Sequence, residues 1–234
     1  MNQPAPSVPD AFLGVWKRTL LRTPLVEDTT STVFWLQTPR WHGDIRIPAV
    51  RPACAGRHSL RDCSAGEVAG LARQQGFAGV TTVEGNLCRW LRRVDFQPPS
   101  NFVDMGRIEF ETPERMLEYG VLQDYFEIWE RLSGSTGEVF VDVAAAPGQD
   151  PETMRPVRIL LATGDYFIRL RPRAATLPPA DGLLDLPGGE AGLRAALDFE
   201  ISFGTRRPGG WRISHSTLPW LEGSSIVPPK APTA

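Results

Sequence analysis

The chain has few cysteines and few histidines, with three of each among its 234 residues. Cys54, Cys63 and Cys88 are too sparse for a disulfide framework, and their spacing does not match a zinc site. No two histidines have a local metal-binding spacing. We therefore expect no metal and no other cofactor, and the scarcity of cysteine favours a reducing, cytoplasmic environment.

Long hydrophobic runs and an excess of positive charge are also missing. No apolar stretch approaches the roughly 18–20 residues of a membrane-spanning helix, and residues 1–6 lack the basic and apolar segments of a secretory signal. The net charge of -2 is not that of a nucleic-acid-binding surface. We expect a small-molecule ligand as partner, with no nucleic acid and no membrane, and the sequence leaves a homodimer open.

Several catalytic motifs are absent as well. The chain contains no Gly-x-Ser-x-Gly elbow, no phosphate-binding loop and no dinucleotide fingerprint. These absences argue against hydrolase, kinase and dehydrogenase activities. They leave open an acid–base enzyme, whose catalytic residues would come from scattered strands.

The sequence does contain turn-forming residues at short intervals. Its 22 glycines and 22 prolines stand between short runs of alternating apolar and polar residues, which is typical of antiparallel strands. Two short helices are expected at 65–75 and 189–197, the first opened by a capping box at Ser64 and Glu67. Residues 1–10 and 227–234 are rich in Pro, Ala and Ser, and we expect them to be flexible tails.

The clearest strand pair is the hairpin of residues 33–48, which is expected to turn at 39–43. One face alternates Trp35 and Gln37 with Asp44 and Arg46, and the opposite face carries only apolar side chains: Phe34, Leu36, Ile45 and Ile47. A similar hairpin follows at 157–172. Further landmarks recur about 122 residues apart, which indicates an internal duplication: Ile45 and Ile168, Gly66 and Gly189, Phe77 and Phe199, Trp90 and Trp211.

The segments 12–18, with Gly14-Val15-Trp16, 33–48 and 76–96 resemble the lipocalin-like (calycin) proteins. The whole chain resembles a family of uncharacterised bacterial and fungal proteins with a lipocalin-like double barrel. This resemblance implies a mostly β fold of two similar antiparallel barrels, which we place at 11–104 and 105–222, each with one short helix. It implies no settled activity.

The candidate ligand-binding residues lie on the mixed face of the first hairpin: Trp35, Gln37, Asp44 and Arg46, joined by Trp90 of the returning hairpin. If this face points into the barrel, Arg46 could bind a carboxylate and Trp35 could stack on an aromatic body. The alternative is that Phe34, Leu36, Ile45 and Ile47 line the interior and the polar set is solvated. An apolar face usually lines an interior, so the second interpretation is favoured.

Candidate acid–base residues are fewer. His42, expected at the hairpin tip, is a candidate general base, although an exposed loop histidine is the commoner case. Glu84 and Asp95 could form a carboxylate pair across their hairpin. Tyr119 and Tyr125 are expected to pack the seam between the two barrels.

Three functions follow from these observations. The first is binding of a small apolar or aromatic ligand, including a carboxylate, in a lipocalin-like barrel. The second is a metal-independent lyase, isomerase or hydratase that uses His42 or a carboxylate as its base. The third is an interaction protein whose barrels are filled by their own side chains.

Overall fold

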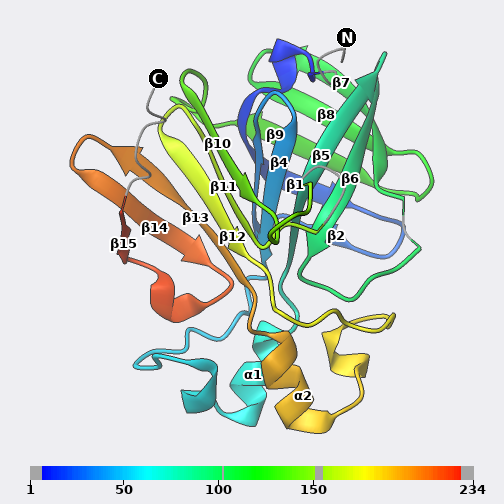
Figure 1. The fold of residues 1–234 in the computed structure, drawn as a ribbon. Coiled ribbons are helices and arrows are strands. Elements are labelled where there is room, and N and C mark those ends of the chain that lie inside the picture. The colour runs from blue at the N-terminus through cyan, green and yellow to red at the C-terminus, as the bar shows by residue number, and fades with distance from the viewer. Residues whose placement is uncertain (1–6, 102, 151–154, 228–234) are drawn as a thin grey trace.

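The computed structural model describes residues 7–101, 103–150 and 155–227. Two antiparallel sheets stand side by side above a pair of short helices (Figure 1). The larger sheet contains β1 (Gly14–Arg22), β2 (Glu27–Asp28), β3 (Thr32–Gln37), β4 (Trp41–Ile47), β5 (Gln75–Glu84), β6 (Leu87–Asp95), β7 (Met105–Thr112), β8 (Arg115–Gly120) and β9 (Phe126–Arg131). The smaller contains β10 (Val139–Ala144), β11 (Arg158–Thr163), β12 (Tyr166–Arg171), β13 (Glu200–Arg207), β14 (Gly210–Ser216) and β15 (Ser225–Ile226).

The larger sheet closes into an eight-stranded barrel because β1 pairs on both of its edges. On one edge Trp16 lies opposite Trp35 of β3, and on the other Arg18 lies opposite Trp129 of β9. Closure leaves β1 and β9 without free edges along this seam. A mostly β fold with an antiparallel barrel is therefore confirmed.

The smaller sheet is open. Its six strands follow the order β10 to β15, and within the described ranges no pairing joins its two ends. The strand pairing therefore does not show the expected second barrel. Strands β7, β8 and β9, which the sequence analysis assigned to the second unit, pair into the first sheet, so the closed barrel runs to Arg131.

The helices are α1 (Ala65–Leu71) and α2 (Gly189–Ala196), which pack against each other at the base of both sheets (Figure 1). The predicted capping box is present, since the hydroxyl of Ser64 accepts from the Glu67 N–H and the Glu67 carboxylate accepts from the Ser64 N–H. α1 ends at Leu71, one turn earlier than expected, because β5 already begins at Gln75. Single 3-10 turns lie at Asp10–Phe12, Leu60–Asp62, Leu183–Asp185 and Pro219–Leu221.

The main hydrophobic core lies between the two sheets and continues down to the helices. The outer face of β3 and β4 meets β11, β12 and β13, and Phe34 stacks on Phe203 with ring centroids 4.3 Å apart. Gly43 allows this close approach, since a Cβ there would come within 2.8 Å of Ile168. The apolar face of the first hairpin therefore packs between the layers and does not line the barrel.

The two sheets repeat one order of elements. β3, β4, α1, β5 and β6 follow one another in the barrel, and β11, β12, α2, β13 and β14 do so in the smaller sheet. In each, the second hairpin contains a register shift at a glycine, Gly79 in β5 and Gly204 in β13. A Cβ at either glycine would meet a cross-strand carbonyl oxygen at about 2 Å, 1.9 Å at Leu91 and 2.1 Å at Arg212.

The chain termini are described only in part. Residues 1–6 and 228–234 of the two expected tails lie outside the described residues. Val8, within the expected N-terminal tail, is buried and its N–H donates to the Pro39 carbonyl at 2.8 Å. In the part of the chain that is described, neither helix has the length and apolarity needed to cross a membrane.

Candidate functional site

The mixed face of the first hairpin points into the barrel. Val33 and Trp35 belong to the barrel core with Trp90 and Trp129, whereas Phe34 and Leu36 belong to the core between the sheets. The favoured expectation, a barrel lined by the apolar face, is wrong. The expectation failed because the apolar face packs against the second sheet and is buried there. The tryptophans and the polar side chains therefore fill the barrel interior.

Tryptophan side chains fill most of the barrel interior. The ring of Trp35 meets those of Trp90 and Trp129 edge-on, with centroids 5.5 Å and 5.9 Å apart. The remaining cavity, which we call the barrel cavity, measures about 10 Å³. Its lining consists of Trp35, Asp44, Arg46, Phe77, Trp90, Asp104, Glu118 and Trp129. A volume of this size holds about one water molecule and no aromatic ligand.

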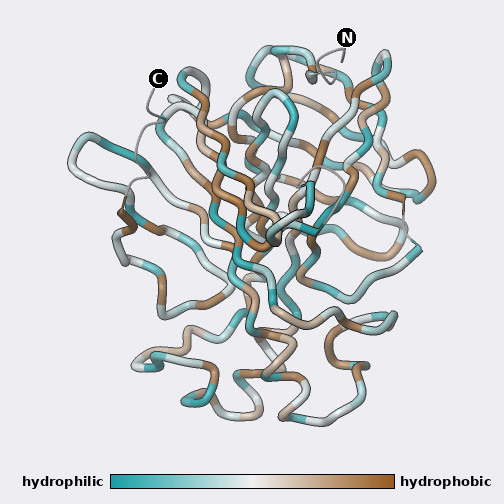
Figure 2. Tube along the Cα trace, in the orientation of Figure 1, coloured by the Kyte–Doolittle hydropathy of each residue, from teal (hydrophilic) through white to brown (hydrophobic). Residues whose placement is uncertain are grey.

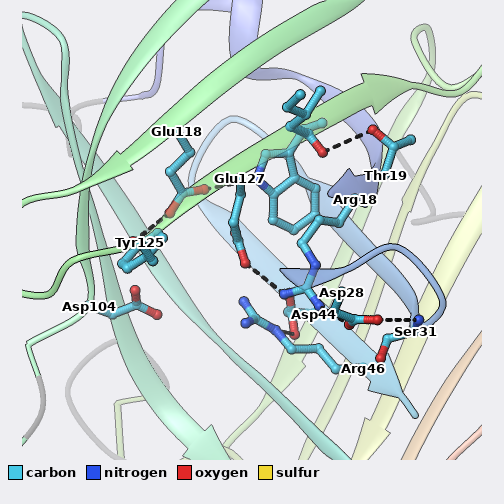
Figure 3. A network of polar contacts seen from close by, with 12 residues as sticks. Arg18, Thr19, Asp28, Ser31, Asp44, Arg46, Asp104, Glu118, Tyr125 and Glu127 are labelled. Carbon is cyan, nitrogen blue, oxygen red and sulfur yellow. Dashed lines mark hydrogen bonds and ion pairs between the residues drawn. The ribbon is translucent and has the colours of Figure 1, made fainter. Parts of the chain in front are cut away.

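Two groups of ion pairs lie inside the barrel, and the residues of one of them, Arg46 and Asp44, line this cavity (Figure 3). Arg18 donates to Glu127 at 2.6 Å and to Asp28 at 3.2 Å, and Arg46 donates to Asp44 at 2.8 Å. Burial raises the pKa of Asp44, an effect that Arg46 opposes only in part. Burial alone would lower the pKa of Arg46, but the nearby Asp44 carboxylate raises it above its ordinary value. Arg46 is therefore committed to Asp44 within the barrel.

Glu118 forms a second polar centre inside the barrel (Figure 3). Its carboxylate accepts from the Tyr125 hydroxyl at 2.7 Å and from the Trp129 indole N–H at 3.0 Å. Burial, and next the charge of Glu127, raises the pKa of Glu118 well above its usual range. Tyr125 therefore contacts the barrel interior and not a seam between two barrels, whereas Tyr119 packs beside Phe126.

His42 lies within β4 and is fully buried, so the expectation of an exposed hairpin tip is wrong. The turn is shorter than expected because β4 already begins at Trp41. The Thr81 hydroxyl donates to Gln37 at 2.7 Å and therefore accepts from His42 Nδ1 at 2.9 Å. Trp35 completes this chain by donating to the Gln37 side-chain oxygen at 3.2 Å.

This arrangement leaves the other ring nitrogen of His42 as an acceptor. Nε2 is buried and has no hydrogen-bond partner among the described residues. Burial, with a smaller contribution from Arg92, lowers the pKa of His42 to about 3. A histidine with so low a pKa is a weak base near neutral pH.

The other expected acid–base pair is not brought together. Glu84 lies opposite Leu87 at the turn of the β5–β6 hairpin, whereas Asp95 lies opposite Phe77 at its far end. Asp95 instead accepts from Arg92 at 2.7 Å. Within the described ranges, no three His, Cys, Asp or Glu side chains are placed to hold a metal ion.

A larger pocket lies where the barrel wall is incomplete. β6 pairs with β7 only from Leu87 to Arg89, and the last cross-strand bond runs from the Trp90 N–H to the Asp104 carbonyl at 3.0 Å. Pro98 and Pro99 follow β6, and neither has the N–H that a continued ladder needs. The unpaired part of β6 borders a pocket of about 510 Å³, which we call the side pocket. Trp90 and Asp104 line both this pocket and the barrel cavity.

The side pocket is rich in arginine. Five arginines line it, Arg89, Arg92, Arg93, Arg155 and Arg173, against two aspartates, Asp95 and Asp104. Arg92 is paired with both aspartates, at 2.7 Å each. Arg173 donates to the backbone carbonyls of Ala196, Phe96 and Asp95. These bonds make Arg173 part of the pocket wall. Burial and the neighbouring Arg155 lower the pKa of Arg173 to about 10.

Arg93 lines the side pocket from a bulge in β6. Ala78 lies opposite Val94 and Gly79 opposite Arg92, so Arg93 is the extra residue of the β-bulge and has no partner on β5. Bulges redirect side chains in this way. The Nε atom of Arg93 is buried and lacks a hydrogen-bond partner within the described part of the chain. Apolar side chains lie beside it in the lining: Leu91, Val94, Val103 and Leu177.

Sequence reasoning missed this pocket. Its arginines in residues 89–93 belong to a segment that alternation predicts as a plain strand, and alternation alone does not reveal a bulge. The nearest sequence signal is Pro98-Pro99, which follows β6, and Pro99 belongs to the lining of the pocket. Of the predicted ligand-binding residues, only Trp90 reaches the side pocket, and Trp35, Gln37, Asp44 and Arg46 lie in the barrel.

Comparison with known proteins identifies the fold but no activity. No protein-family model and no curated protein sequence matches this chain. Among solved structures, the chain is similar to the uncharacterised protein YLR301w from Saccharomyces cerevisiae, with 11% sequence identity and a TM-score of 0.52. The match covers 87% of this chain and 84% of that one. At this identity the similarity shows a shared fold alone.

Proposed function

We propose that this protein binds a small molecule that combines an apolar or aromatic body with an anionic group such as a carboxylate. The proposed binding site is the side pocket beside β6. The observation that carries the proposal is the position of Arg93 in the lining of this pocket beside apolar side chains, with a buried Nε that has no hydrogen-bond partner among the described residues.

The size of the side pocket supports this assignment. Its volume of about 510 Å³ lies within the roughly 300–1,000 Å³ of small-molecule sites. The barrel cavity, at about 10 Å³, is too small for the same ligand. We therefore propose that the ligand binds at the open wall of the barrel, where Trp90 lines both spaces.

The charge of the site supports an anionic ligand. Arg92 is neutralised by Asp95 and Asp104, and Arg173 is held by backbone carbonyls. Arg89 and Arg93 line the same pocket, and within the described residues no ion pair is formed by either of them. A carboxylate accepts paired N–H groups of a guanidinium more readily than any neutral group does.

The proposal includes a lipocalin-like origin for both sheets. The repeated order of strands and helix, and the repeated glycine bulge at Gly79 and Gly204, support one ancestral unit used twice. A cytoplasmic location is also proposed, since Cys54, Cys63 and Cys88 are all free thiols.

Thermal-shift and calorimetric titration with aromatic carboxylates and fatty acids tests this function. Saturation at 100 times Kd should stabilise the folded protein by about 2.7 kcal/mol. Arg93→Gln should weaken binding of a carboxylate by about tenfold or more, because a hydrogen bond to a charged group is lost. Thr176→Trp should block the pocket sterically, since Thr176 is exposed and belongs to its lining.

Arg61→Gln is the matched control, because Arg61 is an exposed arginine outside the pocket lining. It should bind as the wild type does. Equal affinity of the wild-type, Arg93→Gln and Thr176→Trp proteins for a ligand would show that the ligand binds elsewhere.

A further inference from the structure

Two arginines of the smaller sheet lie together at one end of the β11–β12 hairpin. Arg155 comes shortly before β11, and Arg173 follows β12. Because Ile159 pairs with Leu170, the start of β11 and the end of β12 lie side by side. The Arg155 side chain donates to the Arg173 carbonyl at 3.0 Å. Strand pairing therefore brings the two arginines to the same place.

This end of the hairpin is held against the barrel. Residues 159–163 of β11 are buried, and the strand carries hydrophobic colour in Figure 2. The Arg173 guanidinium donates to the carbonyls of Asp95 and Phe96. Asp95 ends β6, two residues after Arg93. The side pocket is thus lined both by β6 and by residues at this end of the hairpin.

Positive charges outnumber negative charges in the lining of the side pocket. Its two aspartates both pair with Arg92, which leaves four of its five arginines. Arg173 donates to backbone carbonyls. Within the described residues, no ion pair is formed by Arg89, Arg93 or Arg155. The positive charge of the lining is therefore matched only in part by its own carboxylates.

The charges of Arg155 and Arg173 repel each other. After burial, the charge of Arg155 is the main cause that lowers the pKa of Arg173, and Asp95 and Asp198 oppose this effect only in part. Burial also lowers the pKa of Arg155, and among the described residues no carboxylate opposes that shift. An anion bound beside Arg155 would relieve this repulsion, since an opposite charge stabilises the charged form of both groups.

We propose that the anionic group of the ligand carries two negative charges, as a phosphomonoester does, and that Arg155 selects for the second charge. Arg93 contacts the anion from β6, and Arg155 contacts it from the smaller sheet. Guanidinium groups suit this ligand class, because their paired N–H groups match the oxygens of a phosphate. The inference rests on the proposed function, since it concerns the same pocket and the same Arg93, and it adds the ligand class and a specificity residue.

Calorimetric titration with phenyl phosphate and phenyl sulfate tests this inference. The two probes share a phenyl ring and a tetrahedral anionic group, but near pH 7 phenyl phosphate carries about two negative charges and phenyl sulfate carries one. Phenyl phosphate should bind the wild-type protein about tenfold more tightly, because its second charge is met by Arg155. At pH 5 the phosphate is mostly singly charged, and the difference should fall to about twofold or less.

Substitutions of Arg155 locate the source of the preference. Arg155→Gln should bind phenyl sulfate as the wild type does, which also shows that the variant is folded, and should lose most of the preference for phenyl phosphate. Arg155→Lys should retain most of that preference, because it keeps the charge. Arg158→Gln is the matched control, since Arg158 is a 57% exposed arginine of β11 outside the pocket lining. It should leave both affinities unchanged.

Equal affinity of the wild-type protein for the two probes would overturn the inference, and so would an undiminished preference in Arg155→Gln. Either result leaves the proposed function in place if Arg93→Gln and Thr176→Trp still weaken the binding of aromatic carboxylates. If the wild-type protein binds neither probe and no aromatic carboxylate, both the inference and the proposed function are wrong.

Discussion

The barrel and the open sheet contain the same bulge with different residues in it. In the barrel the extra residue is Arg93, which lines the side pocket. In the open sheet Phe203 lies opposite His215 and Gly204 opposite Ile213, so the extra residue is Ser214. The Ser214 hydroxyl turns back to the Phe203 carbonyl at 3.2 Å. The same backbone bulge thus lines a pocket in one unit and makes only a local hydrogen bond in the other.

The two units also contain ion pairs that differ in burial. In the barrel, closure by β9 places Arg18 among Glu127 and Asp28, with the Arg18 and Glu127 side chains only 6% and 4% exposed. In the open sheet, Arg158 and Asp142 form a pair whose side chains are 57% and 35% exposed. Burial makes the charges of the Arg18 pairs depend on one another, whereas water supports the charges of the Arg158 pair. The open sheet also contains a more buried pair, Arg169 and Glu200, whose side chains are 29% and 7% exposed.

Removing the bulge should have the largest effect. Gly79→Ala would place a Cβ 1.9 Å from the Leu91 carbonyl oxygen, and Gly204→Ala 2.1 Å from that of Arg212. We expect each to lower the free energy of unfolding by more than about 4 kcal/mol in urea titration. Gly209→Ala is the control, since nothing lies within 4 Å of its Cβ position. A mild effect at Gly204 alone would show that the two bulges are not equivalent.

Breaking one ion pair in each unit tests whether a buried pair contributes more to stability than an exposed one. Arg18→Met leaves Glu127 and Asp28 without their partner inside the barrel, and should lower the free energy of unfolding by about 3 kcal/mol. Arg158→Met should change it by less than about 1 kcal/mol. The measurement is urea unfolding at neutral pH. Similar losses for both variants would contradict the view that closure makes the charges interdependent.

The pH dependence of stability compares the two histidines that lie in strands. His42 has a folded pKa of about 3, below its ordinary value of 6.5, so its contribution is present above pH 6.5 and lost as pH falls. Between pH 7 and pH 5 the wild-type protein should lose about 2 kcal/mol through this group. His42→Gln should flatten that part of the profile, measured by urea unfolding at each pH.

His215→Gln provides the comparison from the open sheet. Burial also lowers the pKa of His215, but Glu222 opposes the shift, so the same substitution should flatten the profile less. Equal effects at the two positions would show that barrel closure does not distinguish them.

Much of the strand pattern could be predicted from the sequence. Alternation located the β3–β4 and β11–β12 hairpins, and the capping residues located α1. Which face of the β3–β4 hairpin points inward could not be predicted. The rule that apolar faces are buried holds for Phe34 and Ile45, but it does not state whether the burial is inside the barrel or between the sheets.

The candidate site could be predicted only in part. Trp90 was expected to bind ligand and does line the side pocket, but Arg93 was hidden because a bulge changes the alternation by one residue. The inward Glu118 and Glu127 carried no local signal, since their positions follow from pairing of β8 and β9 with each other and of β9 with distant β1. Pairing over such separations is not encoded in any short window.

The pairing of β1 with β9 has a consequence for how the chain folds as it is synthesised. The other neighbouring strands of the barrel lie much closer together in the sequence. The pairing of Arg18 with Trp129, in contrast, cannot form until β9 has been synthesised. Until β9 leaves the ribosome, the nascent sheet has two open edges and cannot enclose its tryptophans or its charges. The open sheet, built from successive neighbours, has no such delay. Loop closure over this separation slows folding, so barrel closure should be the late step of the N-terminal unit.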